Sequence, residues 1–163
     1  DIIINTYKDI VEKGQHIAYQ NIGDVLLAST YAGIAFGNTG VGAVHALSYP
    51  LGGKYHVPHG EANYAFFDAV MKKYEEYNPT GKILKIKEII GEILQLPNKE
   101  KAITLLDVTI NKVMPRKRLR EYGMQENDLL SFTTSAMEQE RLMKNNYVPL
   151  SNEDVLKIYK SLY

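Results

Sequence analysis

The segment from 37 to 63 constrains the fold more than any other part of this 163-residue chain. It reads GNTGVGAVHALSYPLGGKYHVPHGEAN and contains three of the four histidines. Pro50 lacks the amide hydrogen that a helix interior needs, and the pair Gly52 and Gly53 favours a helix end. We therefore expect the helix that carries His45 to stop there and the chain to turn, so that His59, fourteen residues after His45, comes back beside it. Metal sites are commonly built in this way, with one imidazole on a helix and another at the start of the next.

The composition is that of an ordinary globular protein. Hydrophobic residues make up 45% of the chain and charged residues 23%, and the length suffices for one domain, residues 1–163, with a substantial core. The formal net charge is zero, which gives no electrostatic basis for binding nucleic acid or a membrane surface. Cysteine is absent. Disulfides and thiolate metal sites are therefore excluded, and a cytoplasmic setting is favoured.

The hydrophobic pattern predicts an all-α fold, a helical bundle-like domain. Apolar residues recur at helical spacing between Gly and Pro breakers, and no pair of alternating strands is found. Ser151 has the pattern of an N-cap, with Asp154 at the third helical position. The expected helices cover residues 2–13, 22–36, 41–49, 59–77, 82–96, 100–113, about 125–139 and the region after Ser151.

His45 and His59 are candidate metal ligands. A neutral imidazole suits zinc and iron, but a catalytic divalent site normally needs three protein ligands and an open position. Within this chain the third ligand would have to come from His56, His16, Glu61 or Asp68. Taken alone, the residues are better explained by two core or surface histidines that bond to backbone carbonyls.

The residues around the two histidines change this interpretation. The runs GVGAVHAL (40–47), LGG (51–53) and PHG (58–60), with Asn63 after them, resemble the C-terminal signature of the iron-containing (group III) alcohol dehydrogenases. That signature has a Gly-x-x-His-Ala helix, a Leu-Gly-Gly turn and a Pro-His-Gly, with its histidines fourteen residues apart. Weaker similarity extends over essentially the whole chain.

The resemblance implies a two-domain enzyme with an N-terminal NAD(P)-binding domain and a helical domain that holds a divalent metal, usually iron and sometimes zinc. It implies that His45 and His59 are two of four metal ligands, one Asp and three His. The other two belong to an upstream Asp-x-x-x-His pattern, and no such pattern with the right context precedes Ile22. A helical pattern that begins at the first residue, without an initiator Met, fits the same picture. We therefore expect this chain to be most of the metal- and substrate-binding domain, without the nucleotide-binding domain, and to be inactive alone.

Tyr49 is a departure from the family pattern, in which many members carry a second histidine four residues after the first. Residues at i and i+4 share a helix face, so Tyr49 should point toward the site of His45. It either donates a hydrogen bond to the substrate, as a catalytic residue, or only fills space. The run 49–59 is most similar to the 4-hydroxybutyrate dehydrogenases, which interconvert 4-hydroxybutyrate and succinic semialdehyde. Lys54 could face the substrate carboxylate, although a solvated lysine is the simpler expectation.

The expected partners are a small alcohol or aldehyde, without nucleic acid or membrane, and the full-length protein is expected to be a homo-oligomer. Two alternatives from other classes stay open at this stage. The chain could be a stand-alone helical interaction module, or a non-redox metalloprotein that uses His45, His56 and His59. The basic cluster at 116–118 is expected to be a solvated loop, and His16 a helix-end or surface residue.

Overall fold

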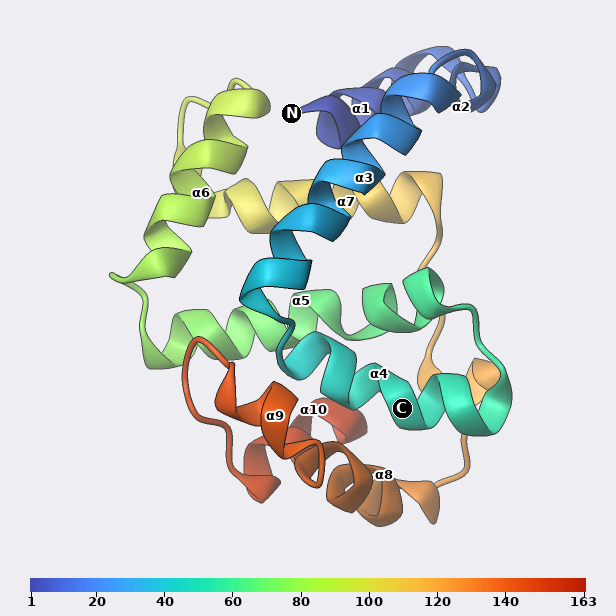
Figure 1. Cartoon of the computed structure of the whole chain (residues 1–163), viewed down its shortest axis with the longest axis vertical. Coiled ribbons are helices and arrows are strands. Elements are labelled where there is room, and N and C mark those ends of the chain that lie inside the picture. Colours follow the sequence, from blue (N-terminus) through green and yellow to red (C-terminus); the bar gives the residue numbers. More distant parts are fainter. The chain divides into compact units, whose positions relative to one another are not determined.

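The structure is a computed structural model that describes residues 1–163, and it confirms the all-α prediction, since it contains helices and no strands (Figure 1). By internal contacts the chain divides into two compact units. The first comprises residues 1–39 and 80–115, and the second comprises residues 40–79 and 116–163. No helix is both long enough and apolar enough to cross a lipid bilayer.

The first unit is built around α1, which packs against α2, α3 and α7, while α6 packs against α7. Its buried apolar side chains include Ile10, Ile83, Ile90 and Ile103. The five-residue α2 was not predicted, because so short a helix shows no hydrophobic period. The helices of this unit are α1 (Ile2–Lys13), α2 (His16–Gln20), α3 (Ile22–Thr39), α6 (Lys82–Ile93), the 3-10 helix η1 (Lys99–Lys101) and α7 (Ala102–Val113).

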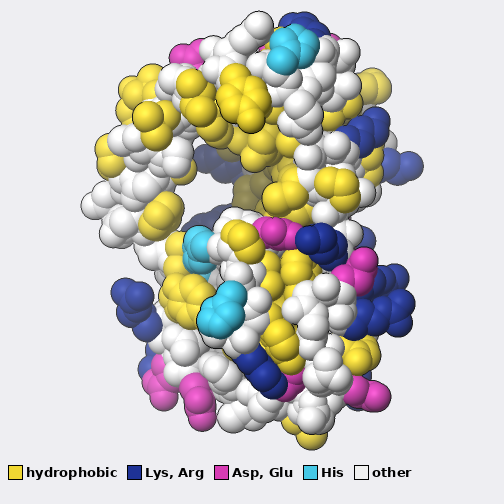
Figure 2. Space-filling view, turned by 90° about the vertical axis from the view of Figure 1, so that its right-hand side faces the viewer, with side chains coloured by type: hydrophobic (Ala, Val, Ile, Leu, Met, Phe, Trp, Pro, Cys, Tyr) yellow, Lys and Arg dark blue, Asp and Glu magenta, His cyan; other side chains and the backbone are white.

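Helix α3 is apolar around its circumference, yet none of its residues is buried. Leu26 is 68% exposed and Ile34 is 59% exposed, and Asp24 is its one charged residue. A helix that is hydrophobic on all sides is normally buried, and contiguous exposed apolar surface marks a place of contact with other protein. Figure 2 shows that hydrophobic side chains are exposed among polar and charged ones on the face that it draws.

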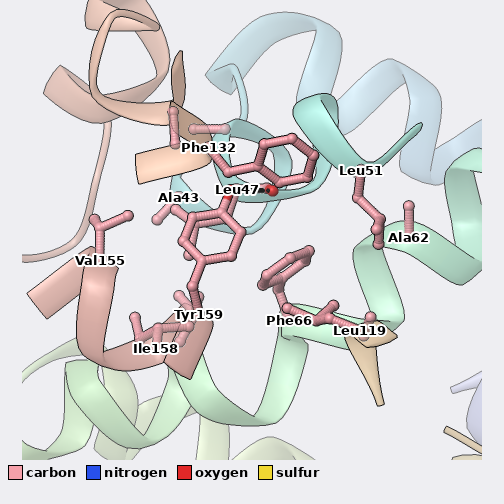
Figure 3. Packing of buried hydrophobic residues seen from close by; sticks show 14 of the residues in the cluster. Ala43, Leu47, Leu51, Ala62, Phe66, Leu119, Phe132, Val155, Ile158 and Tyr159 are labelled. Atoms are coloured by element: carbon pink, nitrogen blue, oxygen red, sulfur yellow. Dashed lines mark hydrogen bonds between the residues drawn. The ribbon is translucent and has the colours of Figure 1, made fainter. Parts of the chain in front are cut away.

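The second unit holds the larger core. Tyr159, Phe66, Leu47 and Leu51 are fully buried there, and Figure 3 shows how they pack together. The ring of Tyr159 meets that of Phe66 edge-on, with centroids 5.3 Å apart, which is a favoured aromatic geometry. Its helices are α4 (Ala43–Tyr55), α5 (His59–Tyr77), the 3-10 helix η2 (Leu119–Tyr122), α8 (Asp128–Met137), α9 (Glu140–Lys144) and α10 (Asn152–Leu162).

Helix α4 does not stop at Pro50, so the predicted helix end there is wrong. The helix continues through Pro50, Gly52 and Gly53 to Tyr55. An interior proline costs about 3 kcal/mol, but Leu47 and Leu51 on either side of it are completely buried. Burying two leucines stabilises the helix by roughly the same amount or more, at about 1.5–3 kcal/mol each. The helix ends instead at His56, whose left-handed backbone (φ 55°) turns the chain toward α5.

The predicted cap of the last helix is confirmed. The backbone amide of Asp154 donates to the Ser151 Oγ at 3.2 Å, and the backbone amide of Ser151 donates to the Asp154 carboxylate at 2.9 Å. Burial would raise the pKa of Asp154, but its bonds from Tyr77 and Ser151 outweigh that effect and lower the pKa to about 2. The carboxylate therefore stays charged and caps α10 near neutral pH.

Candidate metal and substrate site

Helices α4 and α5 bring His45 and His59 together. His45 is the third residue of α4, and His59 is the first residue of α5, directly after Pro58 at its N-cap. The centroids of the two imidazole rings lie 5.2 Å apart. The predicted proximity of the two rings is therefore observed, although the turn between their helices is made at His56 and Val57 rather than at Pro50.

Asn63 lies between the two rings. Its amide nitrogen is 3.0 Å from His59 Nε2 and 3.3 Å from His45 Nε2. Sequence reasoning noted Asn63 only as part of the family pattern and gave it no role in the site. The spacing of Asn63 could have predicted its place beside His59. It follows His59 by four residues and so shares a face of α5 with it.

Ser48 connects Asn63 to α4, and sequence reasoning missed it. Its side-chain oxygen lies 2.6 Å from Asn63 Oδ1 and 3.0 Å from the main-chain oxygen of His45. Ser48 is 1% exposed, so this hydroxyl has no access to bulk water. A serine three residues after a candidate ligand was the only sign of this contact in the sequence.

Tyr49 lies beside both histidines, as its helical spacing predicts. Its ring centroid is 6.4 Å from that of His45 and 6.4 Å from that of His59. Its side chain remains 40% exposed. Together with His59, Tyr49 lines a pocket of about 270 Å³, whose other walls are Ser48, Gly52, Gly53, Val57 and Ala62.

The surroundings of His45 favour its neutral form. Burial lowers the pKa of His45, and the nearby His59 lowers it further by charge repulsion. A neutral imidazole is the form that binds metal. His45 is therefore unprotonated over a wider pH range than a free histidine.

The two imidazoles fit part of a divalent metal site. The rings lie 5.2 Å apart, and imidazole nitrogens suit zinc and iron; both Nε2 atoms face the Asn63 amide nitrogen, which would have to move aside for an ion to bind them. No group of three or more His, Asp or Glu side chains that could hold a metal ion gathers in the chain. The chain thus supplies two suitable donors, fewer than the three protein ligands that a catalytic site normally has.

The other candidate ligands are engaged or placed elsewhere. Glu61 pairs with Lys117 at 3.1 Å, and Asp68 pairs with Lys72 at 2.7 Å. His56 follows the last residue of α4. The exposed His16 is the first residue of α2, in agreement with the expectation that it is a helix-end or surface residue.

Lys54 is not simply solvated, in contrast to the simpler expectation from sequence. It forms an ion pair with the buried Asp128, which also accepts a hydrogen bond from the hydroxyl of Tyr55. These two hydrogen bonds, helped by the backbone amide of Gln125, outweigh burial and lower the pKa of Asp128 to about 2. Lys54 therefore already has a carboxylate partner within the chain.

The basic cluster at 116–118 is also not a free loop. Arg116 lies over the ring of Tyr64, 4.3 Å from its centroid, and donates to the Tyr64 carbonyl at 3.2 Å. Arg118 donates to the Ser161 carbonyl at 2.9 Å. The segment is a loop in which Lys117 and Arg118 are exposed, as expected, and Arg116 and Arg118 in addition bond to α5 and α10.

Comparison with known proteins agrees with these features. The model of the Fe-containing alcohol dehydrogenase family, C-terminal, matches residues 1–163. The chain is 51% identical over its whole length to 4-hydroxybutyrate dehydrogenase of Clostridium kluyveri, of which it covers 44%. It is 33% identical over 86% of its length to long-chain-alcohol dehydrogenase 1 of Geobacillus thermodenitrificans, of which it covers 36%.

The fold comparison points the same way. The structure resembles 1,3-propanediol oxidoreductase with a TM-score of 0.61 and 25% identity, over 75% of this chain and 32% of that one. The chain thus spans less than half the length of these relatives. It belongs to the iron-containing alcohol dehydrogenase family and corresponds to the C-terminal region of its members.

Proposed function

We propose that this chain forms the metal- and substrate-binding part of an NAD(P)-dependent alcohol dehydrogenase that interconverts 4-hydroxybutyrate and succinic semialdehyde. The observation that carries the proposal is the approach of the His45 and His59 rings, whose centroids lie 5.2 Å apart, beside a small pocket that His59 and Tyr49 line. The substrate is chosen because 51% identity extends over the whole chain to 4-hydroxybutyrate dehydrogenase.

In this proposal His45 and His59 hold a divalent metal, iron or zinc, through their Nε2 atoms. The metal, when bound, supplies a Lewis acid that lowers the pKa of the alcohol oxygen. NAD(P) supplies the hydride acceptor. The remaining metal ligands and the cofactor-binding surface come from the part of the protein that corresponds to the rest of the relatives' length.

Tyr49 acts on the substrate side in this proposal. Its ring lies near both imidazoles and its side chain is partly exposed on the pocket wall. The phenolic hydroxyl can donate a hydrogen bond to the substrate oxygen without displacing a ligand. The pocket, of about 270 Å³, is below the range of about 300–1,000 Å³ that is typical of drug-sized ligands, which suits a short-chain substrate.

The carboxylate of 4-hydroxybutyrate needs a cation, and no Lys or Arg lines this pocket. Lys54, the nearest candidate in sequence, is paired with Asp128. We therefore propose that the cation which recognises the carboxylate lies outside residues 1–163. The exposed apolar surface of α3 supports contact of this chain with further protein.

The test is a dehydrogenase assay on the full-length protein, combined with metal analysis. Short alcohols, diols and ω-hydroxy acids would be compared, each with NAD and with NADP. We expect the highest kcat/KM for 4-hydroxybutyrate and a divalent metal bound to the protein. A higher kcat/KM for an uncharged diol or a simple alcohol would contradict the substrate assignment and leave the family unaffected.

A further inference from the structure

Helix α4 begins without a capping side chain of its own. Its N-cap residue is Gly42, which has no side chain to bond to the backbone amides of the first turn. A serine, threonine, aspartate or asparagine normally satisfies one of these amides. The first turn matters here because His45, a candidate metal ligand, is its third residue. The start of α4 therefore needs a hydrogen-bond acceptor from elsewhere in the chain.

Asn146 provides this acceptor from 103 residues away. Its side-chain oxygen accepts a hydrogen bond from the backbone amide of Ala43, the first residue of α4, and another from the Tyr74 hydroxyl at 3.0 Å. A backbone amide can only donate, so the Asn146 atom that faces Ala43 is the oxygen. The nitrogen of the same side chain lies 3.6 Å from the Met143 sulfur. Asn146 thus caps α4 in place of the side chain that its N-cap residue lacks.

The glycine at position 42 is what this contact requires. A Cβ on Gly42 would lie 2.8 Å from Asn146 Oδ1, which is closer than real Cβ contacts come. A side chain at this position would therefore push the Asn146 oxygen away from Ala43. The neighbouring Asn145 bonds to the same segment, since its side-chain nitrogen donates to the Val41 carbonyl at 3.2 Å. Two consecutive asparagines thus hold the segment that leads into α4.

We propose that Asn146 is a positioning residue, which caps the first turn of α4 and so holds His45 beside His59. The effect on His45 is direct, because a first turn that opens takes the backbone of its third residue with it. This inference rests on the proposed function for the metal that His45 would hold, whereas the cap is a property of this chain's own residues. Loss of an N-cap shifts the equilibrium toward the open first turn by about 2- to 30-fold.

The cap is tested by hydrogen exchange with mass spectrometry on the metal-free full-length protein. Asn146→Leu introduces a side chain of similar size that accepts no hydrogen bond, so we expect the amides of residues 43–48 to exchange about 2- to 30-fold faster. In Asn146→Asp a carboxylate oxygen still accepts from Ala43, and a negative charge is favourable at a helix N-terminus, so the slow exchange should be kept. Asn98→Leu is the matched control. It removes an oxygen that accepts from the Glu100 backbone amide at 2.8 Å, outside α4, and should leave residues 43–48 unchanged.

The rate of metal release separates the positioning of His45 from a purely structural cap. A metal that His45 holds can leave when the first turn opens. In Asn146→Leu we therefore expect a chelator to remove the metal from the full-length protein faster, by about the same factor as the exchange of residues 43–48 rises. Asn146→Asp should restore slow release, and Asn98→Leu should retain it. Gly42→Ala, which displaces the Asn146 oxygen from the other side of the contact, should reproduce the result of Asn146→Leu.

The proposal is overturned if residues 43–48 exchange equally fast in Asn146→Leu and in the unchanged protein. It is also overturned if their exchange becomes faster while metal release does not, because Asn146 would then cap α4 without acting on His45. Neither measurement uses alcohol oxidation. A full-length protein that holds a metal but does not oxidise 4-hydroxybutyrate would contradict the proposed function and leave both results standing. If the protein bound no metal, the proposed function would fail, and so would the positioning of a metal ligand, whatever the exchange rates.

Discussion

The hydroxyl of Tyr159 donates a hydrogen bond of 2.7 Å to the main-chain oxygen of Leu47 (Figure 3). This bond joins the last helix, α10, to α4 two residues after His45. Tyr159 is completely buried, and burial raises the pKa of its hydroxyl, so it remains a donor at all ordinary pH values. The C-terminal helix thus supports the helix that carries a candidate ligand, through a bond between residues 112 positions apart in the chain.

We expect Tyr159→Phe to lower the free energy of unfolding by about 1 kcal/mol, the usual net contribution of one hydrogen bond. The ring and its aromatic contacts would remain, so the loss reports the hydroxyl alone. Urea denaturation followed by circular dichroism would measure it. Tyr19→Phe, at a side chain that is 79% exposed, is the matched control and should leave the free energy unchanged.

The Asp128 carboxylate should make stability depend on acid pH. Its pKa falls from 3.8 to about 2 in the folded chain, first through the Lys54 and Tyr55 hydrogen bonds. Because the folded pKa is lower than the unfolded one, the stabilisation is complete above about pH 4 and is lost as the pH falls toward about 2.

Asp128→Asn should therefore destabilise the chain at pH 7, and its difference from the unchanged protein should shrink between about pH 4 and pH 2. Denaturant midpoints across that range would show the trend. Glu126→Gln, at an exposed neighbour, serves as the control. A difference that stayed constant with pH would mean that the ionised carboxylate is not the stabilising species.

The isolated chain should show no dehydrogenase activity. It supplies two metal donors and gathers no third His, Asp or Glu beside them, and it spans 44% of the 4-hydroxybutyrate dehydrogenase that it matches over its whole length. Reduction of NAD by residues 1–163 would be followed at 340 nm. A rate above that of the His59→Ala variant of the same chain would contradict this expectation.

Zinc binding by the isolated chain should also be weak. Two imidazoles replace only part of a coordination shell, so we expect a Kd no tighter than roughly micromolar, or about 8 kcal/mol. Structural zinc sites with four ligands reach apparent values of about 10–16 kcal/mol. Isothermal titration calorimetry would decide, and tight stoichiometric binding would mean that further residues of this chain complete the shell.

Local sequence signals predicted much of the fold. The predicted range of α5 agrees with the structure at both ends, and the Ser151 cap was correct, because Pro58, the Asn78-Pro79 turn and the capping pattern act within a few residues. The helix end at Pro50 was wrong, because burial of Leu47 and Leu51 by α5 and α8 is a tertiary effect that a local rule does not contain.

The site could be predicted only in part, because some of its contacts also depend on tertiary packing, which local sequence rules do not contain. The spacing of His45, Tyr49 and His59 predicted that their rings would lie close together. The contacts of Ser48 and Asn63 depend on how α4 and α5 face each other, and a buried serine next to a candidate ligand has no distinctive pattern. The pairing of Lys54 with Asp128, 74 residues apart, likewise depends on tertiary packing.

Metal content of the full-length protein tests the central claim most directly, since it separates ligands from substrate-side residues. We expect His45→Ala and His59→Ala to lose the metal and turnover, because each removes a nitrogen that we propose coordinates the metal. Tyr49→Phe should keep the metal and lose only part of the rate, about 5- to 150-fold, which corresponds to roughly 1–3 kcal/mol for a lost hydrogen bond. Mass-spectrometric metal analysis of the three purified variants, with steady-state kinetics on the same samples, gives the answer. A His45→Ala protein that kept its metal and its activity, or a Tyr49→Phe protein that lost its metal, would contradict the account.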